Sequence, residues 1–161
     1  MDVAARSIRQ RPVRRGDMTT NNVHTAFARA REARIDEAEI AWIASKRGAA
    51  MRSRDADWLA ARYEPGARVV GPTPPITRIA DPTIDAVRIW EWFELLQGRI
   101  RWTVGIADVR LDGDLAVCRT REHVSYRALA HRRVRLELAT TIGLRRHPDG
   151  WRIEWEIAIG A

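Results

Sequence analysis

Residues 141–161 read TIGLRRHPDGWRIEWEIAIGA, two runs of alternating apolar and polar residues joined by a short turn. Residues 147–150 (HPDG) supply the turn, because Pro and Asp-Gly favour the tight backbone angles of a hairpin. If the hairpin closes there, Ile142 lies opposite Trp155, and cross-strand partners share a face. Glu156 is then expected on the outward face. The expected inward face is Leu138, Thr140, Ile142, Leu144, Ile153, Trp155, Ile157 and Ile159.

The other helices and strands follow from changes in the hydrophobic period. Helical spacing predicts helices at residues 32–51, at Ala56–Tyr63 with Ser53 or Asp55 as cap, and from Asp81-Pro82 to Gln97. Alternation predicts strands at residues 67–71, 100–106, 115–126, 134–146 and 150–159. Three helices and one short strand thus precede a four-stranded meander. This order indicates an α+β fold with three helices packed on the concave face of a curved, mostly antiparallel sheet.

The N-terminal residues 1–31 are expected to form a disordered tail, because they are rich in arginine and show no hydrophobic period. The folded domain is then expected to span residues 32–161. No apolar run approaches the roughly 20 residues needed to cross a bilayer, so we expect no membrane partner. The single cysteine, Cys118, cannot form an internal disulfide, which is typical of a cytoplasmic chain.

The formal net charge is +7, from 28 basic and 21 acidic residues. A nucleic-acid-binding chain gathers its basic residues into a stripe with aromatic or groove-reading elements. Here acidic residues alternate with arginines along the chain, as in residues 31–37 (REARIDE). We therefore expect no nucleic-acid partner.

Four short segments, taken in order, resemble the SnoaL-like and ketosteroid-isomerase-like branch of the nuclear transport factor 2-like superfamily. They are RDADWL at 54–59, YEPGARVVGP at 63–72, DGDLAV at 112–117, and TIGLRR with DGWRI within 141–153. The resemblance implies a cone-shaped α+β barrel with one deep apolar pocket, and a homodimer through the convex sheet face. The superfamily includes cyclases, isomerases, dehydratases, epoxide hydrolases and non-catalytic binding proteins, so the resemblance implies a fold and not one reaction.

The acid–base residues of two better-known branches are missing from the matching positions. The base, tyrosine and acid of ketosteroid isomerases fall on Gly71, Arg47 and Ile142, none of which matches. Many SnoaL-like relatives place inward-facing histidines on the last strand, where this chain has Trp155 and Ile157. We therefore do not expect steroid isomerisation by the known mechanism.

Polar groups that face inward are expected on the strand at 115–126. Its even-numbered residues face inward, because the odd-numbered side carries Arg119 and Arg121. Glu122 is then the one acid expected to face the pocket, where burial would raise its pKa and suit it to general acid or base catalysis. Pairing with Arg47 would instead keep Glu122 ionised.

We expect Glu122, Tyr63 and Tyr126 to carry any proton transfer. Four scattered histidines and the lack of a Gly-rich phosphate loop predict neither a metal nor another cofactor. The expected pocket residues are Trp42, Ile43, Arg47, Trp90, Trp102, Cys118, Thr120, Thr140, Ile142, Trp155 and Ile157.

Two functions of different kinds are open from the sequence. The first is a cofactor-free cyclase or isomerase that folds a polyketide-like or other hydrophobic small molecule in an apolar pocket. The second is a non-catalytic module that binds a small apolar ligand or dimerises. Epoxide hydrolysis ranks third, because it requires an inward Asp-Arg-Asp set that the sequence does not provide.

Overall fold

The computed structural model describes residues 17–72, 86–128 and 133–161. The chain divides into two units, Met1–Arg34 and Ile35–Ala161. Helix α1, Asp17–Ser53, begins in the first unit, so residues 17–31 are helical where the sequence pattern predicted a disordered tail. The described side chains of residues 22–32 are exposed, and they are rich in alanine and arginine, which favour a helix without tertiary contacts.

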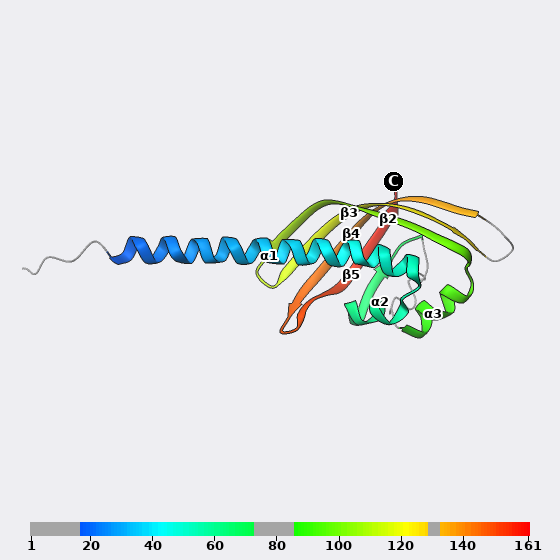
Figure 1. Cartoon of the computed structure of the whole chain (residues 1–161), viewed down its shortest axis with the longest axis horizontal. Helices are drawn as coiled ribbons and strands as arrows, with labels where there is room; N and C mark the ends of the chain where they lie inside the picture. Colours follow the sequence, from blue (N-terminus) through cyan, green and yellow to red (C-terminus); the bar gives the residue numbers. More distant parts are fainter. Residues whose placement is uncertain (1–16, 73–85, 129–132) are drawn as a thin grey trace, which may run out of the picture. The chain divides into compact units, whose positions relative to one another are not determined.

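The second unit contains the end of α1 and all the remaining elements. These are α2 (Ala56–Arg62), β1 (Tyr63–Val70), α3 (Ala86–Glu94), β2 (Gln97–Asp112), β3 (Leu115–Arg127), β4 (Arg133–His147) and β5 (Gly150–Gly160). Strands β2 to β5 form an antiparallel meander, and β1 adds to β5 in parallel, which gives the order β1-β5-β4-β3-β2 (Figure 1). The predicted α+β fold with a curved, mostly antiparallel sheet is confirmed. Within the described residues β1 and β2 each pair on one side, so the sheet that these residues form is open and not a closed barrel.

Local sequence signals account for the element ends. The side chain of Asp55 accepts a hydrogen bond from the backbone N–H of Trp58 at 3.0 Å, which caps α2 as predicted. Gly113 adopts a φ of 58° in the turn between β2 and β3, a conformation that favours glycine. The predicted helix start at Asp81-Pro82 lies outside the described residues. Among those residues, no helix has both the length and the apolar composition to cross a bilayer.

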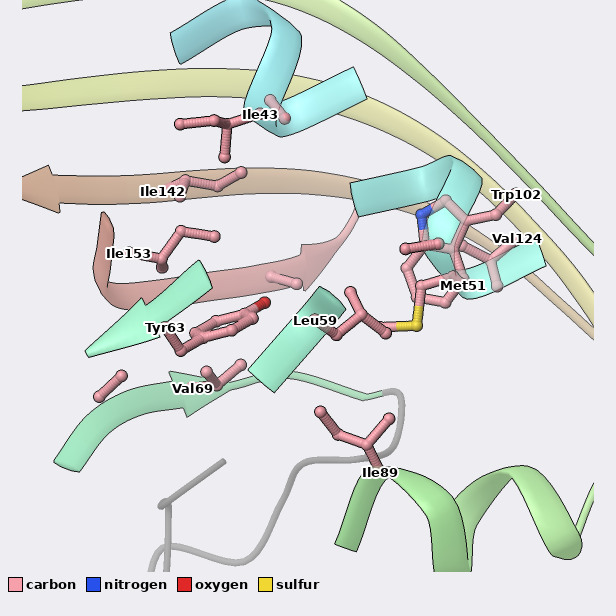
Figure 2. Close-up of a cluster of buried hydrophobic side chains, with 14 of the residues drawn as sticks. Ile43, Met51, Leu59, Tyr63, Val69, Ile89, Trp102, Val124, Ile142 and Ile153 are labelled. Carbon is pink, nitrogen blue, oxygen red and sulfur yellow. The ribbon is translucent and has the colours of Figure 1, made fainter. Parts of the chain in front are cut away.

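One face of α1 packs into the core at helical spacing. Ile40, Ile43, Ala44 and Met51 are all buried on it, and charged Arg47 lies in the same stripe. Figure 2 shows Ile43 near Ile142 and Ile153 of the sheet, and Leu59 of α2 between Tyr63 and Met51. The even-numbered residues of β3 from 116 to 126 are also buried, as predicted. The inner sheet face and the helices therefore enclose one core.

The β4–β5 hairpin contains a bulge that corrects one prediction. Leu144 pairs with Ile153, but Gly143 pairs with Trp155, so Glu154 is an extra residue on β5. Gly143 makes this possible, because a Cβ atom there would lie 2.1 Å from Cε2 of Trp155. Beyond the bulge the faces of β5 exchange.

The predicted inward positions of Trp155, Ile157 and Ile159 are therefore wrong. Ile157 and Ile159 are exposed on the outer face and Trp155 is half-buried there, while Glu156 is buried on the inner face. The sequence offered one signal, since an isolated glycine such as Gly143 inside a strand is typical of a bulge.

Candidate functional site: a buried arginine between two carboxylates

Arg47 of α1 is buried in the core, with a residue exposure of 2%. The following residue, Gly48, lets α1 approach β2 closely, because a Cβ atom there would lie 2.6 Å from Cγ2 of Val104. The same approach places the guanidinium of Arg47 over the ring of Trp102, 5.6 Å from its centroid. A glycine in the helix thus brings a charged side chain into the core.

Two glutamates from different strands bind this guanidinium. Nη1 of Arg47 donates to Oε1 of Glu122 on β3 at 2.9 Å and to Oε2 at 3.1 Å. Nε of Arg47 donates to Oε2 of Glu156 on β5 at 2.9 Å, and Nη2 donates to its Oε1. Both glutamates are almost fully buried. The carboxyl groups of two glutamates and one guanidinium therefore form an acid–arginine–acid set.

Both carboxylate oxygens of Glu122 accept further hydrogen bonds. Thr120 Oγ1 donates to its Oε1 at 2.7 Å, and Trp102 Nε1 donates to its Oε2 at 2.6 Å. Burial alone would raise the pKa of Glu122, but the charge of Arg47 and these hydrogen bonds outweigh burial and lower it below 4.5. Glu122 is therefore an ionised carboxylate, as its pairing with Arg47 predicted, and it is not a proton donor near neutrality.

Glu156 also binds a tyrosine of the site. The hydroxyl of Tyr63, the first residue of β1, donates to Oε2 of Glu156 at 2.8 Å. Burial and the charge of Glu156 raise the pKa of Tyr63 well above 10, although Arg47 opposes the shift. Burial acts to lower the pKa of Arg47, but the two glutamates have the larger combined effect and raise this pKa above its ordinary value. The guanidinium therefore stays charged. Tyr63 is thus a protonated donor beside a carboxylate.

The predicted site residues fall into two groups. Tyr63, Arg47, Glu122, Trp102 and Thr120 meet directly through the contacts above, whereas Glu156 was missed. Other buried members are Ile43, Cys118, Thr140 and Ile142. Among the described residues, Thr140 Oγ1 is buried without a hydrogen-bond partner, and burial raises the pKa of Cys118 to about 11.

Three predicted aromatic positions do not join the site. Trp42 and Trp90 are about half exposed, at 51% and 48%, so they do not line the interior. Tyr126 is on the inner face but contacts Trp92, with ring centroids 5.9 Å apart. It lies four residues along β3 from Glu122, which corresponds to about 14 Å.

Three hollows bordered by described residues lie away from the arginine. Two of them adjoin each other. The hollow of about 510 Å³ lies on the outer face of β2, β3 and β4, and the hollow of about 320 Å³ lies at the end of these strands. A third, of about 410 Å³, lies between β1 and β5 at residues 64–68 and 154–155. None of the three is lined by Arg47, Glu122 or Glu156.

Comparison with known proteins agrees with this arrangement of helices and strands. Residues 40–156 match the SnoaL-like domain. The chain belongs to the SnoaL-like domain family. No curated protein matches the sequence.

Solved structures share the fold of this SnoaL-like domain at low sequence identity. A nuclear transport factor 2-like superfamily protein from Salmonella enterica is 14% identical with a TM-score of 0.64, over 80% of this chain and 92% of that one. A nuclear transport factor 2-like protein with a cystatin-like fold from Novosphingobium aromaticivorans is 22% identical with a TM-score of 0.59, over 89% and 90%. A ketosteroid isomerase-like protein from Erwinia carotovora is 18% identical with a TM-score of 0.59, over 76% and 94%. These similarities describe the fold alone.

Proposed function

We propose that this SnoaL-like domain is a cofactor-free acid–base catalyst that isomerises or cyclises a hydrophobic, polyketide-like small molecule. The observation that carries the proposal is the set in which Glu122 and Glu156 share Arg47 and Tyr63 binds Glu156. Chemistry of this kind requires a carboxylate base and a proton donor that meet at one point. Glu156 and Tyr63 meet at 2.8 Å.

The energetic cost of the cluster supports a functional role. Taking an ion out of water costs several kcal/mol, and a buried ion pair is often no more stable than apolar residues of the same volume. Here the charged Arg47 and the ionised Glu122 lie together with Glu156 in a core built mainly of apolar residues. Buried titratable groups with shifted pKa values, such as Glu122 and Tyr63, cluster at catalytic sites.

The contacts suggest different roles for the two carboxylates. Glu122 is bound by three different side chains, so we assign it to holding Arg47 in place. Glu156 is the proposed base, and Tyr63 is the proposed hydrogen-bond donor to a substrate oxygen on which charge develops. Arg47 would stabilise that charge from the same side.

Epoxide opening is favoured by one specific observation. The Glu122–Arg47–Glu156 set is the counterpart of the acid–arginine–acid arrangement that the sequence alone did not provide. In that reaction Glu156 would take a proton from a water molecule as the water oxygen attacks an epoxide carbon and the C–O bond of that carbon breaks. Tyr63 would protonate the freed oxygen, and the proton on Glu156 would return to Tyr63 through their hydrogen bond. Glu122 would not be the acid, because its pKa is lowered.

A non-catalytic module is the alternative from a different class. It is favoured by the burial of the cluster, since Arg47, Glu122 and Glu156 are each at most 2% exposed. A fully hydrogen-bonded network of this kind also fixes one packing of α1 on the sheet. In this alternative the chain binds a small apolar ligand, or a partner, without changing it chemically.

The test is turnover of a panel of cyclic enones, linear polyketide-like ketones and aliphatic epoxides, followed by mass spectrometry. Wild type is expected to convert at least one class, and Glu156→Gln is expected to lower kcat by a factor of about 100 or more. Glu154→Gln, two residues before Glu156 on β5 and bound to Arg145, is the matched control and should retain activity. Equal turnover by Glu156→Gln and wild type would refute the assignment, whereas binding without conversion would support the non-catalytic module.

We also propose that the outer sheet face forms a homodimer, as the family resemblance implies. Val70, Ile157 and Ile159 are exposed there at 49%, 46% and 61%, on the adjacent strands β1 and β5. A contiguous exposed apolar surface of this kind is typical of an interface. Its burial against a second copy would remove the three side chains from water.

Light scattering after size-exclusion chromatography tests the dimer. Wild type should elute at twice the chain mass of 18.4 kDa, and Ile157→Lys with Ile159→Lys should shift the population to monomer. Leu95→Lys, at another exposed apolar residue, is the control and should leave the mass unchanged. A monomeric wild type, or a dimer that survives the double substitution, would contradict this proposal.

A further inference from the structure

The outer face of β2, β3 and β4 is rich in arginine. Strand alternation separates the charges that are mixed in the sequence, because Glu122 points inward while its neighbour Arg121 points outward. The two adjoining hollows share Arg101 and Ser125. Their arginines are Arg99, Arg101, Arg127, Arg133 and Arg135, all exposed.

These arginines have almost no acidic neighbours on the described surface. Of the residues that line the two hollows, Glu137 is the one acid, and it lies 3.6 Å from Nδ1 of His123. Arg127 is paired directly opposite Arg133, and like charges in such a position destabilise a sheet. The arrangement therefore does not serve the stability of the sheet, and it leaves a strongly positive surface.

We infer that this arginine surface binds the phosphate backbone of a nucleic acid without reading its sequence. Arginine binds phosphate through paired hydrogen bonds, and Arg101 and Arg135 stand on either side of the small residue Ser125. Two strand spacings separate them, about 10 Å, which leaves room for a phosphate group over Ser125.

The length of the arginine surface favours a polymer over a small anion as its ligand. Outward arginines continue along β3 from Arg127 to Arg121 and Arg119, and all three are exposed. Eight residues of strand span about 27 Å, which is longer than a nucleotide or an isolated phosphate ligand. A backbone that repeats its phosphates meets several of these arginines at once.

The side chains of this surface favour contact with the nucleic-acid backbone over contact with the bases. Two residues with aromatic rings line the hollows: Tyr126 is buried at 8% exposure, and His123 lies beside Glu137. Exposed bases therefore find no exposed tyrosine, tryptophan or phenylalanine ring there on which to stack. A duplex, in which the bases are already stacked, is the expected form of the partner.

The inference is independent of the proposed catalysis, since Arg47, Glu122 and Glu156 are on the other face. It also leaves the proposed dimer interface free, because Val70, Ile157 and Ile159 belong to β1 and β5. It reverses the expectation of no nucleic-acid partner. That expectation relied on the order of charges along the chain, which does not show how a sheet sorts them between its faces.

Fluorescence anisotropy with the full chain and a labelled DNA duplex of arbitrary sequence tests the inference. Wild type should bind at low salt, with an affinity that falls steeply as salt rises. Arg101→Glu with Arg135→Glu should weaken binding at least tenfold and reduce the slope of log affinity against log salt by about 2. The milder Arg101→Gln with Arg135→Gln keeps the test valid if charge reversal impairs folding.

The matched control reverses the same number of charges elsewhere. Arg9→Glu with Arg11→Glu, in the arginine-rich N-terminal segment, should weaken binding less than the change on the sheet. No binding by wild type, unchanged binding by the sheet variant, or a larger loss in the N-terminal variant would each overturn the inference.

Discussion

Replacing Arg47 by methionine is expected to lower the free energy of unfolding by about 3–5 kcal/mol. The substitution leaves the carboxylates of Glu122 and Glu156 buried without their shared cation. An uncompensated buried charge is far more costly than a pair that is absent altogether. Urea unfolding followed by circular dichroism measures the loss, with Lys46→Met, the neighbouring and half-buried cation, as the control.

Neutralising the partners should recover much of that loss. The triple variant Arg47→Met, Glu122→Gln, Glu156→Gln removes all three charges and keeps similar side-chain shapes, so it should be more stable than Arg47→Met alone. If Arg47→Met costs no more than Lys46→Met, the guanidinium is not the centre of the cluster.

The stability of Arg47→Met should change with pH in a defined direction. In wild type the pKa of Glu122 is lowered in the folded state, so its contribution to stability is complete above about 4.5 and is lost as pH falls through the lower folded value. Without Arg47, burial is expected to raise that pKa instead. Stability of Arg47→Met should then increase as the pH falls from 7 toward 5, whereas that of wild type should not.

Replacing Trp102 by alanine is expected to lower the free energy of unfolding by a similar amount, about 3–5 kcal/mol. The indole is 1% exposed, it packs against Arg47, and its N–H binds Oε2 of Glu122. Alanine would leave a cavity and an unpaired carboxylate oxygen. Phenylalanine keeps most of the ring and removes the donor, so it should cost about 1–3 kcal/mol and raise the pKa of Glu122 toward its ordinary value.

Trp90→Ala is the matched control for this experiment. Trp90 is 48% exposed on α3, so its loss should cost less than 1 kcal/mol. Chemical denaturation of the three variants under the same conditions gives the comparison. Equal losses for Trp102→Ala and Trp90→Ala would show that the indole does not support the cluster.

The sequence predicted the fold and the inner face of β3 because both depend on simple alternation. Glu122 was found in this way, since the charged odd-numbered side left the even side for the core. Arg47 also had a signal, because it interrupts an apolar stripe of Ile40, Ile43, Ala44 and Met51 at helical spacing. Its pairing with Glu122 was one of two alternatives until the packing of α1 on the sheet was known.

Glu156 could not be found by alternation, because one extra residue in β5 reverses the faces beyond it. The bulge depends on a tertiary contact, the indole of Trp155 over Gly143. The spacing of apolar residues along the sequence does not reveal this contact. Trp42 and Trp90 show a second limit. A large aromatic side chain indicates burial only on average, and both of these residues lie off the buried stripes of their helices.

The most direct test of the buried cluster is the pH titration of Glu122 by carbon NMR of its labelled carboxyl group. Glu122→Gln identifies the signal. Because Arg47, Thr120 and Trp102 hold the ionised form, the carboxylate should remain more than half ionised at pH 4.5. A signal that titrates above pH 4.5 would contradict the account, since burial would then outweigh the pairing with Arg47.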